Sequence, residues 1–152
     1  NLDRLSYTAQ LIIARKFGNV GSLELLPTYV HRNYVKIGTE IGSQFVNPNN
    51  GATETNGLFA LGAAARIKLA KRHSILVEYF YTFSKYRHNN PMHPYYQPIS
   101  IGYEIETGGH VFHINFTNAV GIIENDFIPY SPDTWKMGGF KWGFNISRVF
   151  NF

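Results

Sequence analysis

Phe-Lys-Trp-Gly-Phe-Asn-Ile-Ser-Arg-Val-Phe-Asn-Phe, residues 140–152, is the stretch that decides the fold. Alternate positions form two sets. One set is bulky and apolar apart from a single arginine, and the other is small and polar apart from a single valine. Because successive side chains of a β-strand point to opposite faces, this pattern predicts a strand with one oily and one polar face. Such strands are typical of outer-membrane β-barrels, which face lipid outside and a polar lumen inside.

The same alternation recurs in six earlier segments. We predict strands at 5–17, 22–36, 57–70, 74–85, 99–107 and 110–118. In the second of these, Pro27 has no amide hydrogen for the sheet, so a bulge or a local break is expected there. Short turns and long loops alternate strictly between the strands, and the long loops span 37–56, 86–98 and 119–138. Short periplasmic turns and long external loops are typical of outer-membrane barrels.

The strand count predicts that these residues are part of a larger barrel. Traced back from a periplasmic end at Phe152, the first of seven strands begins outside. Bacterial single-chain barrels have an even number of strands. We therefore expect an odd number of strands upstream, with residues 1–152 forming a single domain, the C-terminal portion of an antiparallel up-and-down transmembrane barrel. No secretory signal opens the sequence, so a mature form or a fragment is expected.

The composition excludes several other classes. Charged residues make up 16% of the chain and aromatic residues another 16%, whereas about 25% charged residues is usual in soluble domains. No apolar run approaches the roughly 18 residues of a membrane-spanning helix. The absence of cysteine removes disulfides and thiolate metal sites. The net charge is +4, but the basic residues form no stripe with aromatic residues, so no nucleic-acid partner is expected.

A soluble β-sandwich or lipocalin-like barrel is the main alternative, because such proteins also alternate apolar and polar residues, with the apolar ones inside. It would bind a small apolar ligand. The polar face of the predicted strands is rich in Gly, Ala, Ser, Thr and Asn instead of Lys and Glu. This composition, the length of the strands and the alternation of loop lengths favour the membrane.

Two stretches, 101–118 and 143–150, resemble a family of predicted β-barrel proteins from Bacteroidota, a domain of unknown function (DUF5777-type). The segments 11–17, 27–33 and 60–69 fit the same pattern. The resemblance implies a barrel of about twelve strands in the bacterial outer membrane. It implies no established activity. Barrels of this kind commonly end in a terminal aromatic strand that the barrel assembly machinery recognises, and the candidate insertion signal here is Phe144, Ile146, Phe150 and Phe152.

The polar faces of the strands supply candidate lumen-lining residues: Arg66, Lys68, Glu78, Glu104, Glu106, His113, Asn115 and Asn145. They could set the selectivity of a porin-like channel for small solutes, or pair with each other in a plugged interior. His113 lies near Glu104 or Glu106 across a hairpin. A His–carboxylate pair could act as a base in a lipid-acting enzyme, but no nucleophile is evident, so we expect a structural hydrogen bond and no enzyme.

The long loops carry weaker candidates. His88 and His93 are too few for a metal site, and the acids Glu124, Asp126 and Asp133 lack the spacing of a calcium loop, so no metal or cofactor is expected. Basic residues near the outer rim could meet lipopolysaccharide phosphates, and they are Lys36, Lys85, Arg87, Lys136 and Lys141. The expected partners are outer-membrane lipid and lipopolysaccharide, the assembly machinery, and other envelope proteins for which the barrel serves as a structural scaffold.

Overall fold

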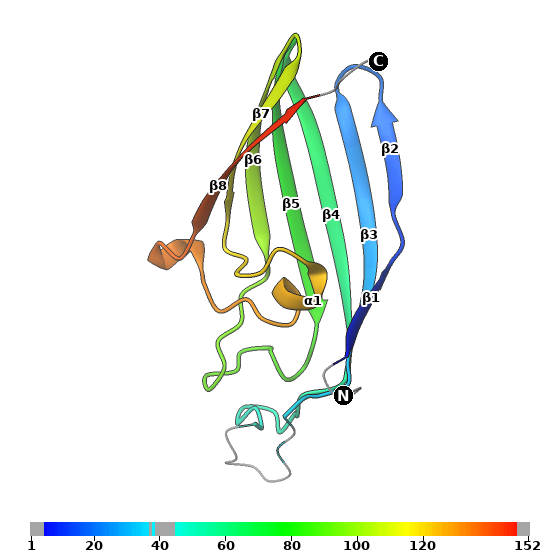
Figure 1. Ribbon diagram of the computed structural model, residues 1–152. Helices are drawn as coiled ribbons and strands as arrows, with labels where there is room; N and C mark the ends of the chain where they lie inside the picture. The colour runs from blue at the N-terminus through cyan, green and yellow to red at the C-terminus, as the bar shows by residue number, and fades with distance from the viewer. Residues whose placement is uncertain (1–4, 37, 39–44, 149–152) are drawn as a thin grey trace.

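The computed structural model describes residues 5–36, 38 and 45–148, and it consists of one curved antiparallel sheet (Figure 1). The strands are β1 (Ser6–Gln10), β2 (Ile13–Phe17), β3 (Gly21–Arg32), β4 (Gly57–Ala70), β5 (His73–Phe83), β6 (Ile99–Thr107), β7 (His110–Thr117) and β8 (Lys141–Arg148). Their order is β1-β3-β4-β5-β6-β7-β8, and β2 also pairs with β3. From β3 to β8, each strand lies beside its neighbour in sequence, and β1 and β2 follow one another along the same edge of β3, as in part of an up-and-down barrel.

The two faces of the sheet are divided as the alternation predicts. The bulky apolar side chains of the strands lie on the convex face and are exposed, for example Phe59 at 63%, Phe144 at 56% and Ile114 at 39%. The concave face carries Glu104, which is only 8% exposed, and a buried cluster around Phe80. A soluble domain would bury the apolar set, so the outward apolar face is the arrangement of a barrel wall in lipid.

Long and short connections lie at opposite ends of the sheet. The described parts of the three long loops, 33–56, 84–98 and 118–140, gather at one end, and the turns at 18–20, 71–72 and 108–109 lie at the other (Figure 1). The last long loop holds the short helix α1 (Glu124–Phe127) and the 3-10 turn η2 (Trp135–Met137). Figure 1 shows α1 on the concave side of the strands. No helix within the described ranges is both long and apolar enough to cross a bilayer.

The break that was expected at Pro27, in the second predicted strand, is not there. The interruption lies instead in the first predicted strand, 5–17. β3 runs through Pro27 without a break and keeps its register with β4. The interruption falls instead on the partner strand, at Leu11 and Ile12, between β1 and β2. Leu11 donates its amide hydrogen to the Pro27 carbonyl at 3.0 Å, but Pro27 has no hydrogen to return. The ladder loses one bond there, and the register on both sides stays the same.

The other boundaries shift by a few residues at the long-loop end. β3 ends at Arg32 instead of Lys36, and β5 ends at Phe83 instead of Lys85. The described part of the closing strand is β8, so Phe150 and Phe152 of the candidate insertion signal lie outside the described residues. Phe144 and Ile146 both lie exposed on the outer face of β8.

Candidate functional site

An ion-paired cluster lies on the concave face near the middle of the sheet. Glu104 of β6 and His113 of β7 are direct cross-strand partners, and His113 Nε2 lies 2.8 Å from Glu104 Oε2. Arg66 of β4 reaches over β5 to the same carboxylate, and its Nε donates to Glu104 Oε1 at 3.0 Å. Ser74 of β5 faces Glu104 in the register and is buried, and its small side chain leaves room for this crossing. Glu104 thus binds groups from two other strands.

This cluster selects between the two partners that the sequence left open for His113, since Glu104 is the one it contacts. The pairing of Arg66 was not specifically predicted. Both oxygens of Glu104 are engaged, so the carboxylate is held in place and its charge is balanced locally. Such a cluster is a structural brace for the polar interior, and it is also the only part of the predicted lumen set that the described structure joins by ion pairs.

The remaining predicted lumen residues are spread along the concave side. A cavity of about 270 Å³ is lined by Glu78 and Asn115, together with Arg66 and Glu24. Lys68 lines a smaller hollow near the short turn at 18–20. Glu106 is exposed at the end of β6, and Asn145 is exposed on β8, a strand at the edge of the sheet. Their role as lumen-lining residues stays a prediction.

The last long loop fills the concave side of the sheet at the long-loop end. Phe127 of α1 packs edge-on against Phe80 of β5, with ring centroids 5.1 Å apart. Ile128 is fully buried beside them, in a cluster that includes the inward side chains Val30 and Leu58. Gly62 lies under Phe80, where a β-carbon would come within 2.5 Å of the ring. The apolar plug therefore belongs to the loop, and the sheet supplies a hollow that fits it.

A buried ion pair joins the three long loops into one cap. Arg87 of the second loop binds both oxygens of Glu54 of the first loop, at 2.8 and 2.6 Å. Its Nε donates to the Pro129 carbonyl of the third loop at 2.9 Å. Arg32, at the end of β3, has its Nη2 3.2 Å from Glu54 Oε2, the oxygen that Arg87 Nη2 also contacts. Arg87 is 6% and Glu54 9% exposed, so Arg87 is not free at the rim for lipid phosphates as the sequence had suggested.

Buried amides reinforce this cap. Asn47, which is fully buried, donates to the carbonyls of Tyr86 and His88 at 3.0 and 2.8 Å. Asn118 donates to the Asp133 carbonyl at 3.0 Å and accepts from the amide of Ile99. These residues and the Arg87–Glu54 pair were missed from the sequence. The partners lie far apart in the sequence, in loops without periodicity. The last long loop carries two apolar pairs, Ile122-Ile123 and Phe127-Ile128, and only the second is buried, so the sequence did not single out the plug.

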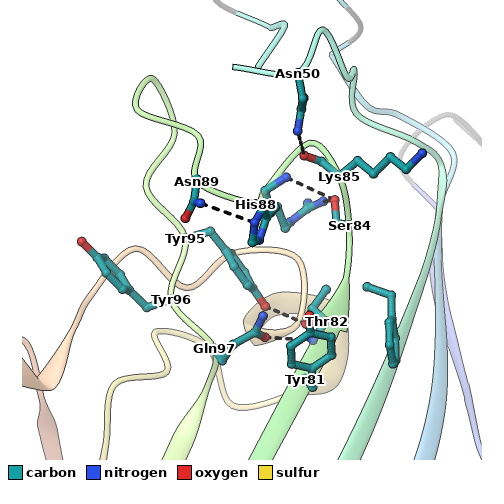
Figure 2. Close-up of a pocket in the computed structure, with 12 residues that line it drawn as sticks. Asn50, Tyr81, Thr82, Ser84, Lys85, His88, Asn89, Tyr95, Tyr96 and Gln97 are labelled. Atoms are coloured by element: carbon teal, nitrogen blue, oxygen red, sulfur yellow. Dashed lines mark hydrogen bonds between the residues drawn. The ribbon is translucent and has the colours of Figure 1, made fainter. Parts of the chain in front are cut away.

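A cavity of about 700 Å³ lies where β5 and β6 separate (Figure 2). The β5–β6 ladder stops at the pair Tyr79–Ile99, and beyond it the segment 95–97 runs beside the end of β5. Gln97 Oε1 accepts the amide hydrogen of Thr82 at 2.8 Å, and the Tyr95 hydroxyl lies 2.7 Å from Thr82 Oγ1. Burial raises the pKa of Tyr95 to about 12, although the bond to Thr82 opposes the shift. Side-chain contacts thus fix the segment 95–97 beside the end of β5 where the backbone ladder has stopped.

The weaker loop candidates do not come together as sites. Within the described part of the chain, no three His, Cys, Asp or Glu side chains are grouped to hold a metal ion. Asp133 is paired with the Lys141 ammonium. His88 lies at the mouth of the 700 Å³ cavity, and His93 lines a different hollow inside the cap.

The outward apolar face, the polar interior and the alternation of short turns with long loops define part of a membrane β-barrel. The match to a family model agrees: residues 1–150 match the membrane-bound β-barrel domain DUF5777. The chain belongs to this family, as the resemblance had implied. Neither the curated proteins nor the solved structures gave a match. Because the family is described as membrane-bound, the soluble barrel with a small apolar ligand is not the right description of this chain.

Proposed function

We propose that this chain belongs to an outer-membrane barrel of a bacterium that acts as a scaffold at the envelope surface, with its long-loop end closed by a folded cap. The observation that carries the proposal is the plug of Phe127 and Ile128, fixed from above by the buried Arg87–Glu54 pair. A channel for solutes needs a continuous polar path. Here apolar side chains fill the concave face of the described strands at the long-loop end, and the loops folded over them offer a surface for envelope partners.

The orientation that we propose places the cap outside the cell. Long loops of bacterial barrels are external and short turns periplasmic. Aromatic side chains gather on the convex face near the loops, where Tyr29 and Phe59 have ring centroids 4.8 Å apart and Tyr81 and Phe83 4.9 Å. Aromatic rings favour the headgroup level of a bilayer, which supports a membrane boundary at this end of the strands.

Closure of the barrel belongs to the same proposal. Among the described strands, β8 pairs only with β7, and β1 and β2 pair only with β3. An unpaired strand edge within lipid is very unfavourable. We infer that further strands bridge the two edges, giving the barrel of about twelve strands that the resemblance implies. A mass measurement on the native protein tests this, since a closed barrel made of these residues alone would refute it.

Planar-bilayer recording of the native protein tests the scaffold against the channel. We expect no steady conductance steps from the wild type, because the plug closes the long-loop end of the barrel. Regular steps with a defined conductance would overturn the capped scaffold. As a matched pair, Phe127→Ala should produce intermittent openings, whereas Tyr130→Ala, which removes an exposed ring from the same loop, should not.

A small-solute channel is the second candidate, favoured by the polar stripe of Arg66, Glu104 and His113 on the concave face. If steps are seen, Glu104→Gln should shift ion selectivity toward anions, since it removes a fixed negative charge.

A lipid-acting enzyme is the third candidate function. It predicts hydrolysis of labelled phospholipid that is lost in His113→Ala, and we expect no hydrolysis from either form.

A further inference from the structure

The 700 Å³ cavity is a cleft in the wall at the long-loop end, and the proposed scaffold role does not use it. It exists because β6 does not follow β5 to the end. The amide of Phe80 bonds to the Pro98 carbonyl, and that of Tyr96 bonds instead to Ser131 in the third loop at 2.8 Å. The chain before β6 is thus drawn toward the cap. The long-loop ends of β5 and β6 are left apart, and the cleft opens between them (Figure 2).

Flat aromatic faces and uncharged hydrogen-bonding groups line the cleft together. Tyr95 and Tyr96 stand on one side and Tyr81 on the end of β5 (Figure 2). Gln97 uses its oxygen on the Thr82 amide, so its NH₂ group remains for a ligand. Aromatic rings that cover apolar ring faces, beside amides that match hydroxyl groups, are suited to a saccharide. The volume is within the range of ordinary small-molecule sites.

Asn89 lies at the mouth of the cleft in a conformation that few residues adopt. Its φ is 48°, the only positive value among the described non-glycine residues. The turn is fixed by its carbonyl, which accepts from Asn49 Nδ2 at 2.6 Å. Its side-chain amide is thereby held beside His88, with Nδ2 3.4 Å from the ring Nε2 (Figure 2). Strained backbone of this kind is often found at ligand-binding positions.

The charge around the cleft is positive. No carboxylate lines it, whereas Lys85 and Arg87 do. Arg87 shares the carboxylate of Glu54 with Arg32, so this group of three side chains carries a net charge of +1 beside the cleft. Lys85 is exposed and can move its ammonium on a flexible stem. An anionic ligand therefore suits the cleft better than a neutral or cationic one.

Two exposed rings connect the cleft to the membrane surface. Tyr81 and Phe83 line it, and they are also 45% and 57% exposed on the convex face of β5. We propose that the cleft binds the anionic saccharide headgroup of a lipid in the leaflet bordering the long loops, with the acyl chains lying against Tyr81 and Phe83. This rests on the proposed orientation, which puts a glycolipid leaflet at that level.

Native mass spectrometry of the detergent-purified protein tests the site with four probes: a short-chain lipopolysaccharide, a neutral galactolipid, phosphatidylglycerol, and the deacylated lipopolysaccharide headgroup. We expect one molecule of lipopolysaccharide to bind at least about tenfold more tightly than any other probe. Equal binding of phosphatidylglycerol, which is anionic but has no sugar, would overturn the proposal that the cleft recognises a saccharide. Equal binding of the deacylated headgroup would keep the saccharide chemistry but overturn the lipid as its source.

Variants of the cleft separate a built site from general lipid adhesion. Asn89→Gly removes the side chain and suits the positive φ, so combining it with Tyr96→Ala should weaken lipopolysaccharide binding about tenfold without unfolding the cap. Lys85→Gln should weaken it up to about fivefold. The matched controls Tyr34→Ala and Lys71→Gln, both at exposed positions outside the cleft, should bind as the wild type does.

Equal affinity of the double variant and the wild type would refute the site. Resistance to unfolding in SDS on mild heating checks that each variant retains its barrel. Conductance does not enter this readout. An open channel that still binds lipopolysaccharide in the cleft would refute the scaffold alone, and a closed barrel without this binding would refute the cleft alone.

Discussion

Glu54→Gln should loosen the cap more than any other single substitution among its charged residues. Among the described residues, Glu54 is the one carboxylate that contacts both Arg87 and Arg32. Its neutralisation leaves two guanidinium groups in a poorly hydrated site without a counter-charge. Removing one member of a buried pair typically costs about 3–5 kcal/mol, and two stranded cations put this case near the upper end, at about 4–5 kcal/mol.

Arg87→Met provides the comparison. It leaves Glu54 in contact with Arg32, 3.2 Å away, and methionine fills part of the vacated volume. We expect a loss near the lower end of the same range, about 3 kcal/mol. The order of the two effects is the diagnostic feature, since it follows from one carboxylate serving two arginines. Glu106→Gln, which neutralises an exposed carboxylate at the opposite end of the sheet, is the control and should change little.

Hydrogen–deuterium exchange of the protein in detergent measures these losses locally. Amides of the cap, such as those of Asn47 and Tyr96, exchange when the loops open. Exchange should become about a thousandfold faster in Glu54→Gln and about a hundredfold faster in Arg87→Met. Peptides from β4 and β5 should remain protected in both. A larger effect from Arg87→Met, or equal loss of protection in the strands, would refute the reasoning.

Three further predictions concern the plug, the short-turn end and alkaline pH. Phe127→Ala should destabilise the cap by about 3–4 kcal/mol through the cavity it leaves, measured by the same exchange of cap amides; unchanged protection would contradict the plug. Gly21→Ala should lower the temperature at which the barrel unfolds in SDS, because a β-carbon there would lie 2.1 Å from a β4 carbonyl oxygen, whereas Gly109→Ala meets no atom within 4 Å and should be neutral. Because burial raises the pKa of Tyr95 to about 12, its contribution is complete below pH 10 and is lost as pH rises toward 12. Cap stability should fall by about 2 kcal/mol over that window, and Tyr95→Phe should remove most of this fall; a fall of equal size in Tyr95→Phe would exclude Tyr95 as its origin.

The strands and their faces could be predicted because alternation is obligatory in a β-strand. Phe144 and Asn145 cannot share a face, so once one face is known to meet lipid the other is fixed. Glu104 and His113 could also be brought together, since a two-residue turn sets the register of their hairpin. The break at Leu11 could not be placed. Its cause, Pro27, lies in the partner strand β3, and the hydrogen bond that Pro27 cannot donate interrupts the strand opposite, between β1 and β2.

The cap and the cleft could not be predicted for a different reason. Arg87 and Glu54 meet because three loops fold against each other, and neither residue carries a local sign of its partner. The cleft depends on where a ladder ends, which is decided by whether Gln97 pairs with β5 through its side chain or its backbone. Sequence patterns report regular structure well. They do not report contacts between irregular segments, and the functional candidates of this chain lie there.

The central claim is that the bulky apolar face meets acyl chains while the polar face lines the interior. The chain has no cysteine, so single cysteines can be introduced one at a time along β6, from Ile99 to Thr107, and spin-labelled in lipid bilayers. Labels at Ile101 and Tyr103 should collide strongly with oxygen and weakly with a water-soluble nickel complex. Labels at Ser100 and Gly102 should not share this lipid signature. The opposite phase, or no alternation along the strand, would contradict the account.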